Sequence, residues 1–209
     1  MDRRDAIGRV ALIMGGAVTG AEFFISGCKS NATKVRGLFD ADNLAFLNEV
    51  ADTILPTTAA SPGAKAANVG QFMAVMVLDC YGPKDQEIFL EGAKKLNEAS
   101  QKKFSSKFMD ITPPQRTELL ISLDKEQKDY YTQQYKNRGA DAAKHKGDTK
   151  YKTADIPNHY FKMIKELTLL GYYTSEVGAT KALRYMETPG HYDGCVGYKK
   201  GDKAWAIDD

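Results

Sequence analysis

The side chains with the most specific chemistry in this chain are a few histidines and cysteines. They are His145, His159, His191, Cys28, Cys80 and Cys195. No two of the histidines lie three or four residues apart, the spacing that places two metal ligands on one face of a helix. We therefore expect structural or solvated histidines and no metal site.

The short motifs of common enzymes are also missing from the sequence. It contains no Cys-x-x-Cys-His for covalent haem, no Gly-x-Gly-x-x-Gly for a dinucleotide and no Gly-x-Ser-x-Gly nucleophile turn. The acidic residues are spread over predicted helix faces, where solvation is the ordinary role. The sequence predicts no catalytic residues, which favours a binding or accessory role over an enzyme.

Composition limits the class of protein further. The chain has 209 residues, 43% hydrophobic and 27% charged, with a net charge of +2. That length suits one domain with a buried core. A nucleic-acid-binding protein would carry a basic excess gathered on one face, so we expect no nucleic-acid partner.

Helical periodicity organises most of the chain. Apolar residues recur at spacings of three and four in five stretches: 42–55, 68–81, 85–98, 112–135 and 158–186. Pro56 ends the first stretch, Asn68 is expected to cap the second, and Thr112 followed by two prolines opens the fourth. We expect Gly171 and Gly178 to break or bend the last stretch, whose apolar residues include Leu167, Leu170 and Tyr173.

Two regions are predicted to lack regular structure. Residues 136–155 are polar and form the best candidate for a long loop, and residues 188–209 are expected to form a coil tail. No alternating strand pattern is present. The predicted fold class is all-α, an irregular multi-helix single domain that follows an N-terminal signal peptide.

The N-terminus has the features of an export signal. Arg3 and Arg4 precede a mildly apolar, glycine-containing run at residues 10–21, which at about 12 residues is shorter than the roughly 20 needed to span a bilayer. Paired arginines before such a run are typical of the twin-arginine route, which carries folded proteins.

A lipid-attachment signal follows this run. Ile25-Ser26-Gly27-Cys28 resembles a bacterial lipobox, in which the cysteine is lipidated and becomes the first residue of the mature chain. We predict a signal peptide at 1–27, a lipid-anchored tether at 28–41 and a helical domain at 42–209, on the periplasmic side of a bacterial membrane. Lys29 follows Cys28 where Asp would signal inner-membrane retention, which favours the outer membrane.

Two further stretches carry a family likeness. Residues 51–69 contain LPTT and SPGAKAA, and residues 171–205 contain GYYTSE, PGHYDGC and KAW. With the signal and the lipobox, they resemble the gluconate 2-dehydrogenase subunit 3 family, over about residues 43–205. The resemblance implies a small non-catalytic subunit that binds no cofactor itself and has no catalytic residues to transfer.

The same resemblance implies partners. They are a large FAD-dependent dehydrogenase of the glucose–methanol–choline type, exported together with the small subunit, and in many complexes a cytochrome c. Two alternatives remain open: a stand-alone periplasmic enzyme that uses the C-terminal region, with Glu176, Arg184 and His191 as candidates, and a binding lipoprotein without a redox partner.

The C-terminal tail suggests two more roles. Tyr192, Tyr198 and Trp205 are candidate partner-binding residues, because aromatic side chains are favoured anchors at interfaces; the alternative is that the tail folds back on its own core. Once Cys28 is lipidated, Cys80 and Cys195 form an even pair in an oxidising compartment. They are therefore predicted to form a disulfide that joins the tail to the core, with two separate buried thiols as the alternative.

Overall fold

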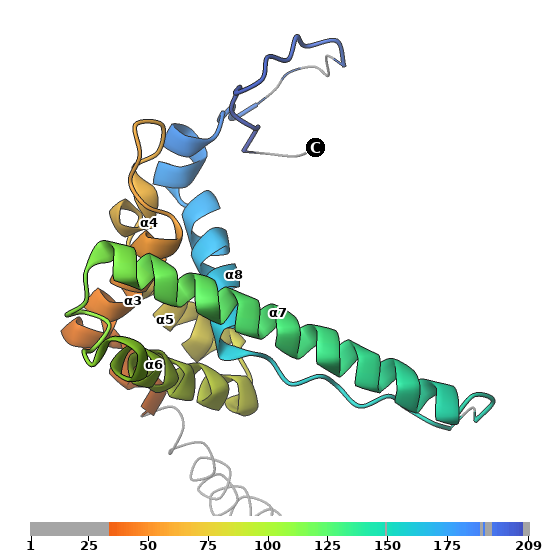
Figure 1. Ribbon diagram of the computed structural model, residues 1–209. Helices are drawn as coiled ribbons and strands as arrows, with labels where there is room; N and C mark the ends of the chain where they lie inside the picture. Colours follow the sequence, from red (N-terminus) through yellow and green to blue (C-terminus); the bar gives the residue numbers. More distant parts are fainter. Residues whose placement is uncertain (1–33, 149, 189, 191–193, 207–209) are drawn as a thin grey trace, which may run out of the picture.

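The computed structural model describes residues 34–148, 150–188, 190 and 194–206 (Figure 1). In chain order its elements are η1 (Gly37–Phe39), α3 (Ala41–Ile54), α4 (Gly63–Ala66), α5 (Val69–Cys80), α6 (Pro83–Phe104), α7 (Pro113–Lys144), α8 (Tyr160–Tyr173) and the π-helical turn η2 (Gly178–Ala182). Within these residues the only β-type pairing consists of two single bridges, Thr58 with Ser61 and Arg184 with Trp205. The all-α prediction is confirmed.

Local sequence sets most of the helix ends. Pro56 follows α3, and Pro83 occupies the first turn of α6. At the start of α7 the backbone N–H of Thr112 donates to Oε1 of Gln115 over 2.9 Å. Asn68 does precede α5, but it adopts a left-handed conformation with φ of 50° and its side chain makes no capping bond, so the predicted side-chain cap is wrong.

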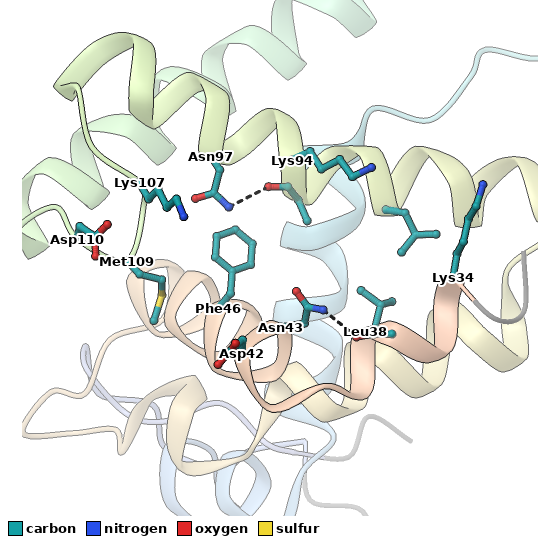
Figure 2. A pocket seen from close by; sticks show the side chains of 13 residues that line it. Lys34, Leu38, Asp42, Asn43, Phe46, Lys94, Asn97, Lys107, Met109 and Asp110 are labelled. Carbon is teal, nitrogen blue, oxygen red and sulfur yellow. Dashed lines mark hydrogen bonds between the residues drawn. The ribbon is translucent and has the colours of Figure 1, made fainter.

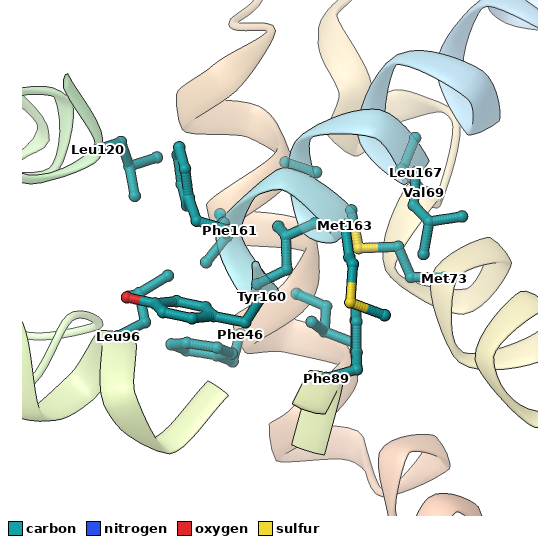
Figure 3. Packing of buried hydrophobic residues seen from close by; sticks show 14 of the residues in the cluster. Phe46, Val69, Met73, Phe89, Leu96, Leu120, Tyr160, Phe161, Met163 and Leu167 are labelled. Atoms are coloured by element: carbon teal, nitrogen blue, oxygen red, sulfur yellow. The ribbon is translucent and has the colours of Figure 1, made fainter. Parts of the chain in front are cut away.

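The core is built around α8, which lies against α3, α5, α6 and α7. Figure 3 shows side chains from all five helices meeting there, among them Phe46, Met73, Phe89, Leu120 and Phe161. These side chains are almost wholly buried, and burying each large apolar side chain contributes about 1.5–3 kcal/mol. The helical stretches therefore fold into one body with a single core.

Gly171 does not break α8, contrary to the sequence-based prediction. The helix continues through Tyr173, and Gly171 is buried where the ring of Phe72 from α5 packs against it. A Cβ atom at this position would lie 2.5 Å from Cδ1 of Phe72. The glycine is there to let two helices approach closely, which outweighs its propensity cost of about 1 kcal/mol.

The predicted loop at 136–155 is partly helical. α7 continues to Lys144, helped by the good helix formers Ala140, Ala142 and Ala143. Its last turns run beyond the other helices, alongside the returning segment 145–159 (Figure 1). Polar and aromatic contacts hold the two together, including a hydrogen bond of 3.0 Å from the Tyr130 hydroxyl to Pro157 O and the stacked rings of His145 and Tyr151.

The packed domain also begins earlier than predicted. Val35 and Leu38 lie in the stretch assigned to a tether, yet both are buried in the core, with 0% and 4% of their surface exposed. Any tether therefore ends before Val35. Among the residues that the structure describes, no helix combines the length and the apolar character needed to cross a bilayer.

Candidate functional site

Of the three residues proposed for a stand-alone enzyme, the structure describes Glu176 and Arg184. Glu176 is exposed in the turn before η2. Arg184 forms an ion pair with Asp202 at 3.4 Å and stacks on the Trp205 ring at 5.3 Å, so it serves to close the base of the tail. His191 lies outside the described residues.

The side chains of the two described histidines, His145 and His159, interact with residues close to them in the sequence. Nδ1 of His159 accepts a hydrogen bond of 3.3 Å from the Phe161 N–H at the start of α8, and its ring stacks on Tyr160. Burial lowers the pKa of His159, although Glu126 at 3.8 Å opposes this effect. Desolvation likewise raises the pKa of Tyr160 to about 12. His159 is thus a neutral N-cap, and His145 is a stacking partner of Tyr151.

A partly buried cluster of ion pairs links α3, α4 and α7. Glu49 on α3 pairs with Arg116 on α7 and, at 3.0 Å, with Lys65 on α4. Arg116 also donates to the carbonyls of Phe108 and Met109, at 3.1 and 2.7 Å. All these partners belong to the protein itself, so the cluster holds helices together. Within the described ranges, no three His, Cys, Asp or Glu residues are placed to hold a metal ion.

The most unusual surface is the solvent face of α8. Leu169, Leu170 and Tyr173 are 36%, 45% and 40% exposed, while Leu167 and Tyr172 on the same helix are buried. Together with the exposed Glu166 these residues recur at i, i+3, i+4 and i+7, so they share one side of the helix. We call this set, Glu166, Leu169, Leu170 and Tyr173, the α8 face.

The sequence pattern groups Leu167, Leu170 and Tyr173 as apolar residues of one helix without assigning a side to each, whereas the structure buries Leu167 and leaves the other two partly exposed. The pattern assigns no side because α8 is apolar almost all round in its second half, from Leu167 to Tyr173. Such a helix is either wholly buried or has a second apolar surface for another molecule. The signal was present in the sequence, but periodicity alone could not say which side faced the core.

The tail adds exposed aromatic residues next to η2. Its described parts lie beyond η2, away from α6 and α7 (Figure 1). Trp205 packs on Arg184 at the base of the tail and stays 45% exposed, while Tyr198 is 78% exposed. The alternative in which these rings fold back into the core is therefore not what the structure shows. Tyr192 lies outside the described residues.

The base of the tail is held by backbone pairing. Arg184 N donates to Ala204 O over 2.8 Å, and Ala206 N donates to Arg184 O over 2.7 Å. These bonds close residues 184–206 into one loop, and most of its described residues are exposed. The tail is thus an attached loop with available aromatic side chains. The prediction of a coil tail is confirmed for its described residues.

Of the remaining predicted sites, the structure describes only the two cysteines Cys80 and Cys195. Arg3, Arg4 and Cys28 lie outside the described residues. Cys80, at the end of α5, is an exposed thiol with Sγ 3.9 Å from Sδ of Met76, and Cys195 is exposed in the tail. The bridge between Cys80 and Cys195 stays a prediction about the oxidised protein.

Comparison with known proteins gives one match. Residues 41–190 match the family model described as gluconate 2-dehydrogenase subunit 3. No curated protein and no solved structure matches the chain. The matched region runs from the first residue of α3 to Gly190 within the tail, so it includes the whole α8 face.

Proposed function

Because the chain belongs to the gluconate 2-dehydrogenase subunit 3 family, we propose that it is the non-catalytic small subunit of an exported FAD-dependent dehydrogenase of the glucose–methanol–choline type. It binds the large flavoprotein subunit through the α8 face and the tail. The flavin belongs to that partner, which oxidises a sugar or an alcohol, and this chain binds no cofactor. A cytochrome c is a further expected member of the complex.

The single observation that carries this proposal is the exposed apolar stripe of the α8 face. Leaving Leu169, Leu170 and Tyr173 in water forgoes the stabilisation that their burial would bring, at about 25 cal/mol for each Å² of apolar surface. Contiguous exposed apolar surface on a soluble domain marks an interaction site. Because the family is one of dehydrogenase subunits, another subunit of the complex is the expected partner at this site.

The tail supports the same role. Trp205 and Tyr198 expose large aromatic surfaces on a loop whose two ends are joined at its base by the Arg184 pairing. Aromatic side chains lose little conformational entropy when an interface orders them, so they are frequent hot spots. A loop of this kind can close over a partner that sits on the helical body.

Export and anchoring complete the proposal. The Arg3-Arg4 pair directs the folded complex through the twin-arginine route, since the large subunit of such complexes usually has no signal of its own. Lipid on Cys28 then holds the complex on the periplasmic side of a membrane, with the outer membrane favoured by Lys29.

The test is copurification of the flavoprotein with surface variants of this chain. Leu170→Asp puts a charge at the centre of the α8 face, and we expect the large subunit to bind more than about tenfold more weakly, because burying a leucine contributes about 1.5–3 kcal/mol. Ile121→Asp is the matched control, since Ile121 on α7 is 66% exposed and equally apolar. Flavin absorbance per mole of small subunit gives the readout.

Trp205→Ala tests the tail in the same assay, with thermal melting of the lone subunit as a second readout. We expect weaker copurification and an unchanged melting temperature. Equal recovery of flavin with Leu170→Asp and Ile121→Asp would remove the α8 face from the proposal. Substrate turnover by the chain alone, with no flavoprotein present, would replace it with the stand-alone enzyme.

A further inference from the structure

A groove on the opposite end of the domain from the tail has no part in the proposed docking. It lies between η1 and α3 on one side and α6 on the other, with a volume of about 660 Å³ (Figure 2). Ligand pockets in proteins span about 300–1,000 Å³, so the volume suits a small molecule. We call it the α3–α6 groove.

The floor of the α3–α6 groove is apolar and already formed. Leu38, Phe46, Leu90 and Met109 line it, and Phe46 is held edge-on against Phe108 with ring centroids 5.7 Å apart. The wall amides are engaged within the protein: Asn43 donates to Gly37 O at 2.7 Å, and Asn97 Oδ1 accepts from the Phe108 N–H at 3.1 Å. The two wall amides therefore have partners within the protein and do not need them from a ligand.

Its charges are unevenly placed. Lys34 and Lys94 lie toward one end, on facing elements, whereas Asp42, Lys107 and Asp110 lie toward the other end (Figure 2). Within the part of the chain that the structure describes, none of these five groups forms an ion pair, so each contributes its full charge to the groove. The end with Lys34 and Lys94 thus carries two positive charges, whereas the other end carries one positive and two negative charges, so an anion is favoured at the lysine end.

We propose that the α3–α6 groove binds one anionic phospholipid drawn from the membrane that holds the protein. The phosphate lies between Lys34 and Lys94, and an acyl chain runs along Leu38, Phe46 and Leu90. Basic side chains attract anionic headgroups, and the apolar floor replaces the hydrocarbon environment of the chain. The charge distribution fixes the direction, with the headgroup at the lysine end.

The position of the groove in the chain supports a lipid source, and this step rests on the proposed anchor. Lys34 follows Cys28 by six residues, and an extended chain of that length spans about 20 Å. A lipidated Cys28 would keep the lysine end of the groove close to the membrane surface. Bound lipid would then add a second, orienting attachment to the covalent anchor on Cys28.

Native mass spectrometry of the full chain purified from its membrane in mild detergent tests the inference. The intact protein should carry one additional anionic phospholipid, and denaturation should remove it while leaving the covalent lipid on Cys28. The denatured mass therefore tests the anchor, and the difference between native and denatured masses tests the groove. The two can fail independently.

Paired variants on α6 locate the site. Ala93→Phe fills the groove from its wall, and Lys94→Glu reverses one of the headgroup charges; each should lower the lipid-bound fraction about tenfold or more. Lys102→Glu is the control, because Lys102 is an exposed lysine on the same helix outside the groove. Circular dichroism verifies that every variant is folded.

Retention of lipid by Lys102→Glu and its loss from both groove variants would support the proposal. It would be overturned by a wild-type protein with no additional lipid, or by equal lipid on all variants. Equal retention of an added zwitterionic phosphatidylcholine would overturn the assignment of the lysine end to an anionic headgroup.

Discussion

The hydroxyl oxygen of Tyr172 lies 2.5 Å from Oγ of Ser61, across 111 positions of the sequence. Tyr172 belongs to α8 and is almost fully buried, whereas Ser61 lies in the loop between α3 and α4. Each residue lies in one of the two stretches that resemble the gluconate 2-dehydrogenase subunit 3 family. Those stretches are therefore neighbours in space, and this hydrogen bond sets their relative position at the back of the α8 face.

Tyr172→Phe should destabilise the domain modestly. Losing a hydrogen bond of this kind costs about 0.5–1.5 kcal/mol, which corresponds to a fall in melting temperature of about 2–4 °C per kcal/mol for a domain of this size. Urea denaturation of Tyr172→Phe, Ser61→Ala and the double variant measures the coupling. If the two single effects simply add in the double variant, the contact does not contribute to stability.

His159→Asn should remove a pH dependence of stability. Burial holds the folded pKa of His159 below its ordinary value of 6.5, so the unfolded chain binds the proton more readily. Stability is then complete above about pH 6.5 and declines as the pH falls toward the folded pKa. Asn keeps a side-chain acceptor for the Phe161 N–H, so the cap itself is preserved.

The measurement for His159 is the melting temperature between pH 8 and pH 5. We expect the wild type to lose more stability than His159→Asn over this interval. His145→Asn is the matched control, because His145 is an exposed histidine that makes no cap for α8. A wild type and His159→Asn that decline in parallel would contradict the prediction.

Cys28→Ala should abolish lipidation and cleavage at that position. The lipobox peptidase acts on the lipidated cysteine, so alanine removes both modifications together. Mass spectrometry of the mature N-terminus should find Cys28 with covalent lipid in the wild type. An unmodified N-terminus at another residue would end the lipoprotein assignment.

Changing Arg3 and Arg4 together to Lys should leave the small subunit and its flavoprotein partner in the cytoplasm. Lysine keeps the positive charge but lacks the planar guanidinium, so the variant separates recognition of the arginine pair from basicity. Cell fractionation followed by a flavin assay gives the readout. Normal periplasmic recovery of the flavoprotein would contradict export of the two as one complex.

The exported protein should contain a disulfide between Cys80 and Cys195. The bridge would close a loop with 114 residues between the two cysteines. In the chain-entropy model, closing a loop of this length stabilises a domain by about 4–5 kcal/mol, less any strain. Thiol titration of the denatured, lipidated protein should find no reactive thiol before reduction. Cys195→Ser should then expose the Cys80 thiol, and titration of two thiols in the unreduced wild type would exclude the bridge.

Much of this protein is determined by the sequence alone, because the signals are local. Pro56, Pro83 and Thr112 mark helix ends through backbone geometry that needs no distant partner. The all-α class follows from periodicity, and the family assignment from the stretches at 51–69 and 171–205 agrees with the match over residues 41–190. The absence of common enzyme motifs is likewise read from the sequence without the tertiary structure.

Only the tertiary structure decided which surfaces are inside. Leu167, Leu170 and Tyr173 recur at spacings of three, so nothing local separates them, yet Leu167 is buried whereas Leu170 and Tyr173 are 45% and 40% exposed. The roles of Gly171 and Val35 also depend on distant residues. Gly171 is needed because the ring of Phe72 packs against it, and Val35 belongs to the domain because it is buried in the core. The α-helix repeats about every 3.6 residues, and an apolar pattern with this period identifies the buried side of a helix only when the opposite side is polar. Because α8 is apolar on both sides, the pattern could not identify its buried side.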